Sequence, residues 1–271
     1  MKRNQFQIDV GSAKLAGIHA GDGPPVVFLH AGVADRRMWH PQIDTFCHDH
    51  LVIAYDRRGF GETTAIDEPF SHVDDLDAVL DHFGLGKVTL VGCSQGGRIA
   101  IDFALQNPNR VTALALIAPA VSGASGPEEW PPQIEALGDA LDAADEADDL
   151  DQINEIEAHM WLDGPLSQAG RVQGELRNLF LDMNGIALNM PELEKEIEPD
   201  SSYERVEELT MPAVVIWGAL DFPHLIERCQ YLVESIPGAK GHEIEKAAHM
   251  VSCEKAEEVN GLLFSAFSLT L

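Results

Sequence analysis

Basic residues are scarce in this chain. The 271 residues include 18 lysines and arginines against 45 aspartates and glutamates, which gives a net charge of −27 at neutral pH. A surface of this sign repels nucleic acid and anionic lipid, so we expect neither of them as a partner. It also repels an anionic substrate unless the cleft is locally positive, so the composition favours a neutral small molecule as substrate.

Cysteines are few, and long apolar runs are missing. The four cysteines show no C-x-x-C or other metal-binding spacing, which favours reduced thiols: Cys47, Cys93, Cys229 and Cys253. No stretch approaches the roughly 18–20 apolar residues that cross a bilayer, and residues 1–10 lack the apolar segment of a signal peptide. We therefore expect a soluble, cytoplasmic protein without a membrane partner. The acidic stretch 139–151 is typical of a solvated helix face, and we predict no metal site there.

Glycine, in contrast, is concentrated around one serine. Residues 88–91 (VTLV) form a short apolar run that is typical of a strand buried on both faces, and residues 92–96 (GCSQG) follow it directly. A helical pattern continues to residue 105. In this strand–turn–helix setting, G-x-S-x-G is a turn so sharp that its central residue is strained and its neighbours must be small. Ser94 is therefore a candidate nucleophile; the alternative is a glycine-rich loop beside a core helix.

The rest of the chain alternates strands with helices on both sides of a strand-free segment. An N-terminal hairpin is predicted first, followed by apolar strands at 26–29, 51–55, 88–91, 111–117 and 213–218 and a short strand around 242–244. Helices are predicted at about 73–83, 95–105 and 223–235, with a last one beginning near residue 253. This order predicts an α/β fold with a mostly parallel, doubly wound sheet.

Residues 122–208 contain no convincing strand and three helical patterns that prolines interrupt. We predict that residues 1–121 and 209–271 form the core domain and that residues 122–208 form an inserted helical cap. The large apolar side chains of this segment are candidates for a roof over Ser94, and they are Trp130, Trp161, Leu179, Phe180 and Met183.

A serine hydroxyl needs a positioned base, usually histidine, which a carboxylate orients. In proteins with this type of turn, the acid follows the serine in the chain and the histidine comes last. His249 stands in a loop between the last strand and the last helix, and Asp221 follows the strand at 213–218. Both loops leave the carboxyl edge of the sheet, where Ser94 also lies. His242, inside a strand, and His224, just after Asp221, are more typical of packing or surface residues.

Two backbone N–H groups are also needed to bind the oxyanion of a tetrahedral intermediate. One donor should be Gln95, directly after the candidate nucleophile. The other should come from the loop after the strand at 26–29, where Gly32 leaves room for a substrate oxygen and Val33 is the alternative.

Taken together, these motifs resemble the α/β-hydrolase superfamily, and most closely its small esterase, enol-lactonase and haloperoxidase-like branch. They are His30-Ala31-Gly32 with Met38-Trp39, Asp56-x-Arg58-Gly59-x-Gly61, the serine turn, Gly218-x-x-Asp221 and His249-Met250. The resemblance implies a cofactor-free enzyme in which Ser94 is the nucleophile, His249 the general base and Asp221 its orienting acid. It implies an oxyanion hole at Gly32 and Gln95 and a structural turn at residues 56–61. Ala31 departs from the pattern, because this branch usually has glycine after the histidine.

The resulting hypothesis is a serine hydrolase that cleaves a small, neutral carboxylic ester or lactone through an acyl-enzyme. Two alternatives stay open: hydrolysis of an activated C–C bond by the same triad, and a small-molecule receptor on a hydrolase scaffold. Arginines that face the pocket from the cap, with Arg171 and Arg177 as candidates, would favour acidic C–C substrates, although surface positions are more typical. A homo-oligomer is compatible with the sequence.

Overall fold

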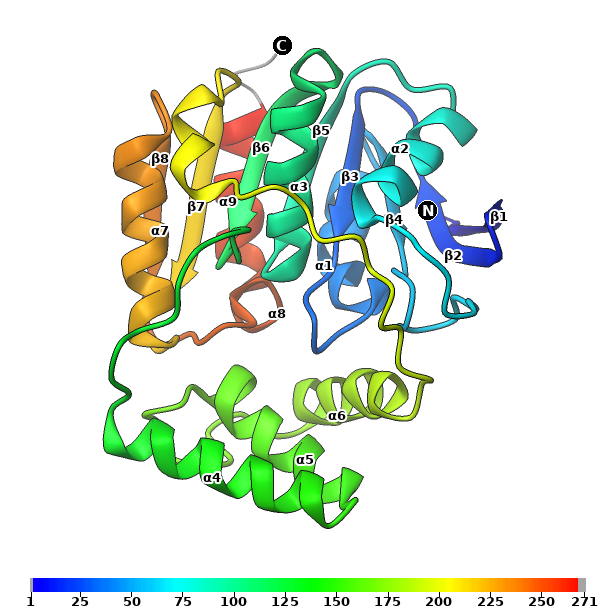
Figure 1. The fold of residues 1–271 in the computed structure, drawn as a ribbon. Coiled ribbons are helices and arrows are strands. Elements are labelled where there is room, and N and C mark those ends of the chain that lie inside the picture. The colour runs from blue at the N-terminus through cyan, green and yellow to red at the C-terminus, as the bar shows by residue number, and fades with distance from the viewer. Residues whose placement is uncertain (1, 268–271) are drawn as a thin grey trace.

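The computed structural model describes residues 2–267, and within them eight strands form one sheet in the order β1-β2-β4-β3-β5-β6-β7-β8 (Figure 1). The first two strands form an antiparallel hairpin, and β2 also pairs antiparallel with β4. All other neighbours pair in parallel. The strands are β1 Asn4–Val10, β2 Ala13–Ala20, β3 Pro25–Leu29, β4 Leu51–Tyr55, β5 Val88–Cys93, β6 Val111–Ile117, β7 Ala213–Gly218 and β8 Lys240–Ile244. The predicted mostly parallel α/β sheet is confirmed.

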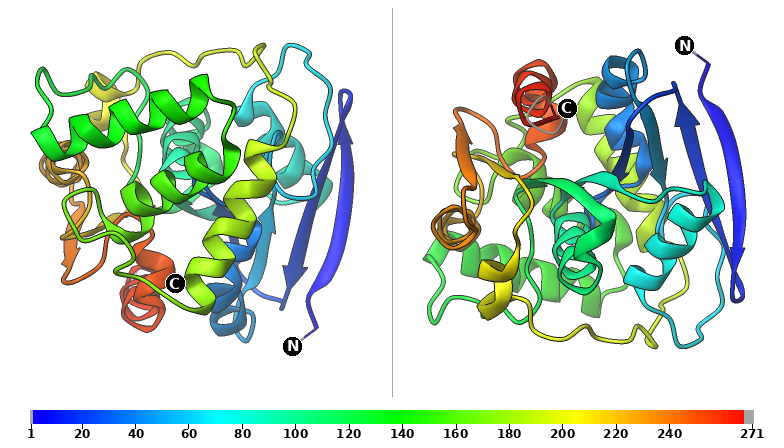
Figure 2. Two further views of the ribbon diagram at one scale, coloured as in Figure 1. Left: turned by 90° about the horizontal axis from the view of Figure 1, so that it is seen from below. Right: turned by 90° about the horizontal axis from the view of Figure 1, so that it is seen from above.

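Helices cover both faces of this sheet, which explains why its central strands are apolar throughout. In β3, Val27 and Leu29 belong to the core under one helical layer, while Val26 and Phe28 belong to the core under the other. Figures 1 and 2 show the two layers on opposite sides of the sheet. One layer contains α2 His72–His82, α3 Gln95–Gln106 and α7 Pro223–Ser235, and the other contains α1 His40–Phe46, α8 Val251–Glu254 and α9 Ala256–Phe267. Full burial of each such side chain contributes roughly 1.5–3 kcal/mol.

Helix α1 and the 3₁₀ turn η1 (Arg36–Trp39) that leads into it were not predicted from the sequence. Asp35 caps η1, because its carboxylate accepts a hydrogen bond from the backbone N–H of Arg37. Pro41 stands in the first turn of α1, where its missing N–H costs nothing. Ile43 and Phe46 then bury one face of the helix. A capping aspartate followed by a proline was thus the local signal that could have predicted this helix.

Between β6 and β7 the described chain contains helices and no named strand. They are α4 Pro132–Glu146, α5 Leu150–Glu157, the π-helical turn η3 Ala158–Asp163, α6 Glu175–Leu188 and the 3₁₀ turn η4 Tyr203–Glu208, which lies beside the sheet domain. Figure 1 shows α4, α5 and α6 below one end of the sheet, and the left view of Figure 2 looks onto them from outside. This is the segment for which the sequence predicts a cap, and its boundaries at residues 122 and 208 stay a prediction.

Both ends of this helical segment are tied to the helix that follows Ser94. Asp102 on α3 accepts hydrogen bonds from the hydroxyls of Ser122 (2.7 Å) and Ser202. The backbone N–H groups of Ser202 and Tyr203 both donate to the carbonyl of Ser122, at 2.9 and 3.0 Å. The chain therefore leaves and rejoins the sheet domain at one point beside α3.

Candidate active site

The turn after β5 holds Ser94 in a backbone conformation that few non-glycine residues adopt. Its φ is +52°, in the left-handed region. The flanking glycines allow the turn to close: a Cβ atom on Gly92 would meet the carbonyl oxygen of Gly96 at 2.3 Å, and one on Gly96 would meet that of Leu29 at 2.1 Å. Side chains at either position would push β3, β5 and α3 apart. The sharp turn predicted from the sequence is therefore present, with steric contacts that require its glycines.

Hydrogen bonds on both sides hold the backbone of Ser94. Its N–H donates to the carbonyl of Ile117 at the end of β6, and its carbonyl accepts from the N–H groups of Arg98 and Ala120, each at 3.0 Å. Ser94 is half-buried and occupies the N-cap position of α3. The positive end of that helix dipole favours negative charge that develops at this point.

His249 and Asp221 meet at the same edge of the sheet. Nδ1 of His249 lies 2.8 Å from Oδ2 of Asp221, and both side chains are almost fully buried. The other carboxylate oxygen of Asp221 accepts from the backbone N–H of Phe222 at 2.8 Å. Nε2 of His249 is buried and makes no hydrogen bond within the described chain. With Nδ1 protonated and bound to a carboxylate, Nε2 is a free acceptor for a proton.

Close backbone packing brings the two loops together. A Cβ atom on Gly218, the last residue of β7, would lie 2.3 Å from the carbonyl oxygens of both Ala247 and Ala248. The N–H of Leu220 donates to the carbonyl of Ala247 at 2.9 Å. The acid-bearing turn and the histidine loop are thus in direct main-chain contact, which sets the separation of Asp221 and His249.

The two other histidines after the helical segment lie elsewhere. His242 is half-buried within β8. His224 packs against the rings of Trp130 (4.9 Å between centroids) and Phe222 (5.6 Å). Burial, followed by the charge of Arg228, lowers the pKa of His224 to about 4. The hydrogen bond to Asp221 therefore belongs to His249 and not to either neighbour.

The loop after β3 presents a fixed peptide group to the site. The carbonyl oxygen of Ala31 accepts from Nδ1 of His30 (2.7 Å) and from Nη2 of Arg57 (3.3 Å), and Nε2 of His30 accepts from the backbone N–H of Arg57 at 3.0 Å. Burial and the charge of Arg57 lower the pKa of His30 well below its usual range, so the ring is neutral. Because a trans peptide has its C=O and N–H on opposite sides, these bonds direct the N–H of Gly32 away from His30 and Arg57.

Gly32 and Gln95, the two predicted oxyanion donors, are neighbours across the site. A Cβ atom on Gly32 would meet the amide group of the Gln95 side chain at 2.9 Å, so the two residues lie in close contact. Val33, the alternative donor, is half-buried beside it. The methyl group of Ala31, which departs from the family pattern, is fully buried in the core. The loop thus accommodates alanine at that position.

The five apolar residues proposed to roof the site lie in different environments. Trp161 stacks obliquely on the ring of His249, with 4.8 Å between centroids, and also contacts Phe222. Phe180 and Met183 are fully buried in the core on the α1 and α9 side, and Leu179 packs against that core. Trp130 is 42% exposed. Trp161 is therefore the member of this set that touches a candidate catalytic side chain.

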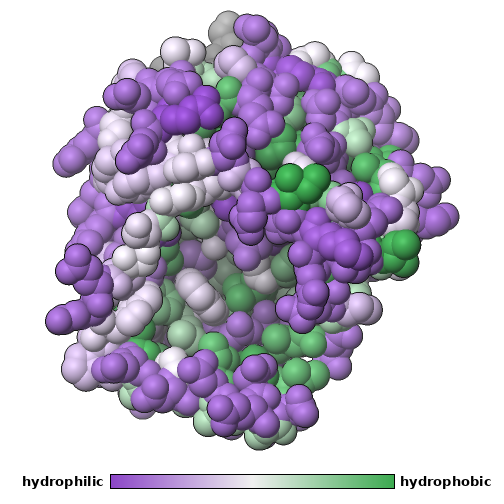
Figure 3. Space-filling view, in the orientation of Figure 1, coloured by the Kyte–Doolittle hydropathy of each residue, from purple (hydrophilic) through white to green (hydrophobic). Residues whose placement is uncertain are grey.

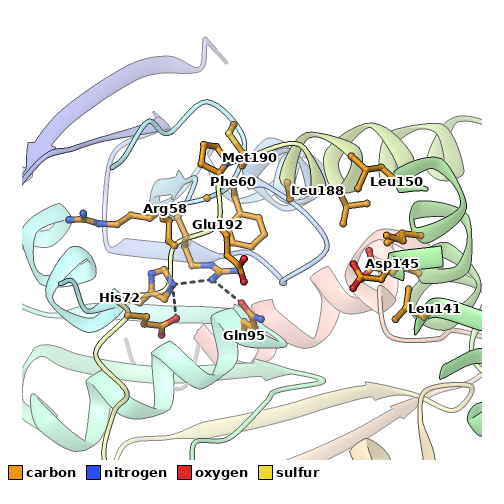
Figure 4. A pocket seen from close by; sticks show the side chains of 18 of the residues that line it. Arg58, Phe60, His72, Gln95, Leu141, Asp145, Leu150, Leu188, Met190 and Glu192 are labelled. Carbon is orange, nitrogen blue, oxygen red and sulfur yellow. Dashed lines mark hydrogen bonds and ion pairs between the residues drawn. The ribbon is translucent and has the colours of Figure 1, made fainter. Parts of the chain in front are cut away.

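A cavity of about 740 Å³ lies between the helical segment and the sheet domain. Figure 3 shows this face hollowed, with apolar side chains inside the hollow and polar ones around it. Gln95 lines the cavity, whereas Ser94, His249 and Asp221 do not, nor do the five residues of the proposed roof. The cavity thus lies beside the candidate nucleophile, on the Gln95 side (Figure 4).

Arg171 and Arg177, the two arginines considered from the sequence as candidates to face the pocket, make internal contacts. Arg171 pairs with Glu254 at 2.7 Å and donates to the carbonyl of Lys246, and Glu254 accepts from the N–H of Ala248 at 2.7 Å. Arg177 pairs with the buried Asp163 (3.0 Å) and with Glu155 (2.6 Å). Arg171 therefore braces the loop that carries His249, and neither arginine lines the cavity.

No role was predicted from the sequence for Arg57, which lies between the loop after β3 that carries Gly32 (the oxyanion loop) and the cavity. Its available signal was an arginine at the variable position of the Asp56-x-Arg58 motif, directly after an apolar strand. Within residues 2–267 no group of His, Cys, Asp and Glu has a metal-binding arrangement, the four cysteines are unpaired, and no helix is long and apolar enough to cross a bilayer.

The fold agrees with comparisons to known proteins. A family model described as alpha/beta hydrolase fold matches residues 24–256. A 2-hydroxy-6-oxononadienedioate/2-hydroxy-6-oxononatrienedioate hydrolase of Burkholderia vietnamiensis is 28% identical over 247 residues, which is 88% of this chain and 85% of that protein.

Two solved structures share the whole fold. An esterase of Thermogutta terrifontis superposes with a TM-score of 0.78 at 25% identity and covers 100% of this chain and 99% of its own. An enol-lactonase of Burkholderia xenovorans superposes with a TM-score of 0.77 at 20% identity and covers 97% of this chain and 100% of its own.

Proposed function

The chain belongs to the α/β-hydrolase family, and we propose that it is a serine hydrolase that cleaves a small carboxylic ester or lactone through an acyl-enzyme. The observation that carries the proposal is the pairing of His249 with Asp221. The pairing leaves a buried, unbound Nε2 at the sheet edge where Ser94 sits in its strained turn. A serine alone is a weak nucleophile, and this arrangement supplies the base and the group that orients it.

In the first half of the proposed reaction, Ser94 Oγ attacks the ester carbonyl while His249 Nε2 takes its proton. Asp221 stabilises the imidazolium that forms, and the backbone N–H groups of Gly32 and Gln95 bind the negatively charged oxygen. When the tetrahedral intermediate collapses, the C–O bond to the alcohol breaks and the imidazolium gives its proton to the leaving oxygen. The acyl group stays on Ser94.

In the second half, a water molecule attacks the acyl-enzyme. His249 accepts the proton of this water, the second tetrahedral intermediate forms in the same oxyanion hole, and the ester bond to Ser94 breaks. His249 then returns its proton to Oγ, and the carboxylic acid leaves. The net reaction consumes one water and needs no oxidant, metal or cofactor.

Hydrolysis of an activated C–C bond is the second candidate. A similar protein supports this candidate: the relative from Burkholderia vietnamiensis is named as a 2-hydroxy-6-oxononadienedioate/2-hydroxy-6-oxononatrienedioate hydrolase. The esterase and the enol-lactonase that share the fold favour the first candidate. Neither Arg171 nor Arg177, the arginines that would favour acidic C–C substrates, lines the cavity.

The proposal is tested by labelling and turnover. A fluorophosphonate should modify Ser94 alone, as peptide mass spectrometry would show, and Ser94→Ala should abolish both labelling and hydrolysis of a panel of chromogenic esters and lactones. Alanine suits the turn because it is small. Modification of a different serine, or near-normal turnover by the variant, would contradict the proposal. A burst of labelling without sustained turnover of any substrate would instead favour the receptor alternative.

A further inference from the structure

One buried arginine has no carboxylate partner. Arg57, just after β4, is 1% exposed, and no carboxylate of the described chain lies within ion-pair distance of it. Its hydrogen-bond partners are all neutral: the carbonyl of Ala31, Oε1 of Gln95 at 3.0 Å and Nε2 of His72 at 3.5 Å. Its guanidinium also lies 4.4 Å from the centre of the Phe60 ring, and its Nε is buried without a partner. A buried charge is costly unless an opposite charge compensates it.

The neighbouring arginines show the usual arrangement. Arg58 is also buried, although less deeply than Arg57, and Asp75 (2.9 Å) and Glu68 (3.1 Å) neutralise it. Glu196, a carboxylate on the same side of the cavity, is bound to Arg98 at 2.7 Å and reaches only His72, at 3.7 Å. Within residues 2–267, Arg57 thus has no carboxylate in contact with it, and Glu196 and Asp56 act on its charge only from a greater distance.

The charge persists at physiological pH. Burial lowers the pKa of Arg57 to about 10, which still leaves the guanidinium protonated at neutral pH. His72, whose Nε2 lies 3.5 Å from Nη1 of Arg57, adds no positive charge, because burial and Arg57 itself lower its pKa well below the usual range.

Arg57 and Gln95 both line the 740 Å³ cavity. Because Oε1 of Gln95 accepts from Arg57, the amide NH₂ of this exposed side chain is left to donate to a ligand. Figure 4 shows Gln95 and His72 together on one wall and Asp145 far across the cavity.

Five acidic residues line the cavity, and three of them, Asp142, Asp145 and Glu192, are exposed, so solvent screens them more than it screens Arg57. Of the other two, Glu196 is paired with Arg98, and Glu157 is half-buried and accepts a hydrogen bond from Asn184.

We propose that Arg57 and Gln95 form a subsite for a carboxylate on the acyl part of the substrate. The proposal rests on the proposed ester or lactone hydrolysis and names its substrate class. The leaving alcohol must lie next to Nε2 of His249, which protonates it. The cavity is lined by Gln95 and not by His249, so it holds the opposite, acyl part of the substrate.

This subsite makes the cleft locally positive, which would overcome the repulsion of an anionic substrate that the net charge of −27 predicts. Long-range repulsion between the protein surface and an anion fades over a Debye length of about 8 Å at 0.15 M salt. The attraction between a guanidinium and a carboxylate in direct contact, with water excluded, depends little on salt. A carboxylated acyl chain is therefore preferred over a neutral chain of the same shape.

The test compares two esters of one shape, 4-nitrophenyl hydrogen glutarate and 4-nitrophenyl 4-carbamoylbutanoate. In Arg57→Met, the ratio of kcat/KM for the charged ester to that for the neutral ester should fall about 10- to 100-fold, the usual range for a charge-assisted hydrogen bond. Arg57→Lys should retain part of the preference. Arg205→Met, which removes an equal charge from an exposed ion pair, should leave the ratio within about two-fold of wild type.

An equal loss of kcat/KM for both esters in Arg57→Met would overturn the subsite, because it would mean that the arginine only positions the oxyanion loop. If that variant does not fold, Gln95→Ala decides the question: it keeps the backbone N–H and should lower the ratio, and an unchanged ratio overturns the proposal.

Binding without turnover separates this proposal from the proposed function. Glutarate should raise the Tm of the wild-type protein more than glutaramide does, and Arg57→Met should abolish the difference. If neither ester is hydrolysed but this Tm difference is found, the proposed function fails and the carboxylate subsite stands. Equal stabilisation of wild type and Arg57→Met by glutarate overturns the subsite whatever the activity.

Discussion

Gly218 lies so close to Ala247 that a Cβ atom on residue 218 would come within 2.3 Å of the Ala247 carbonyl oxygen. The contact joins the end of β7 to the loop that carries His249, and it therefore determines how Asp221 and His249 approach each other. The 2.8 Å separation between their side chains depends on the absence of a side chain three residues before the acid.

Gly218→Ala should accordingly lower kcat by at least ten-fold, while the chain still folds. The methyl group would push the histidine loop outward, and a displacement of about 1 Å in a catalytic group can cost about a hundred-fold in rate. Steady-state kinetics with a chromogenic ester and circular dichroism measure the two properties. Gly138→Ala is the matched control, because a Cβ atom on that glycine of α4 meets nothing within 4 Å. Equal activity of the two variants would show that the contact is unimportant.

His249→Ala should lower kcat by several orders of magnitude, and His242→Ala should leave it nearly unchanged. Of these two histidines only His249 is hydrogen-bonded to Asp221, and only a ring held in this way offers Nε2 to the serine. Asp221→Asn should be strongly impaired as well, because an amide can present an N–H to Nδ1 and favour the wrong tautomer. Pre-steady-state and steady-state ester hydrolysis measure these effects. An essential His242 together with a dispensable His249 would reverse the assignment.

Trp161→Ala should change the relative activities on long and short acyl chains. The indole stacks on His249 at 4.8 Å, so its removal opens space next to the reacting bond. Each methylene that an apolar pocket accommodates is worth roughly 1–3 kcal/mol, which is enough to change a preference ten-fold. Measurements of kcat/KM across 4-nitrophenyl esters of increasing length test this. Trp130→Ala is the control, since Trp130 contacts His224 and not His249. If kcat/KM changed by the same factor for every ester, Trp161 would have no role in selecting the acyl chain.

His72→Gln should weaken the dependence of stability on pH. Burial, followed by the charge of Arg57, holds the pKa of His72 well below 6.5, so the unfolded chain binds a proton that the folded chain does not. This contribution to stability is complete above about pH 6.5, the unfolded value, and is lost as the pH falls below it, by about 1.4 kcal/mol per pH unit.

Urea unfolding of wild type and His72→Gln at several pH values between 7 and 5 measures that slope as a difference between the two proteins. Buried carboxylates such as Asp75, whose pKa is raised by burial, change the stability with pH in the opposite direction. Both proteins contain these carboxylates, so their effect cancels in the difference. A difference in unfolding free energy that does not change with pH would contradict the prediction.

The sequence alone determined the features that depend on short-range steric rules. The glycines around Ser94 predicted the sharp turn, because compact residues are required wherever strands and a helix approach so closely. Apolar runs predicted the parallel strands, because both faces of such a sheet are covered. The order of loops along the chain placed Asp221 and His249 at the edge where Ser94 lies.

Only the tertiary structure decided which side chains meet across long stretches of chain. Phe180 and Met183 are apolar residues of a helix in either case, and packing alone buries them in the core instead of leaving them over the cavity. Arg57 and Arg58 are adjacent and chemically identical. Among the described residues, Arg58 has carboxylates within ion-pair distance and Arg57 has none, because successive side chains leave the turn in different directions. Compensation of a buried charge depends on distances of a few ångström between residues far apart in the chain, and local sequence does not determine those distances.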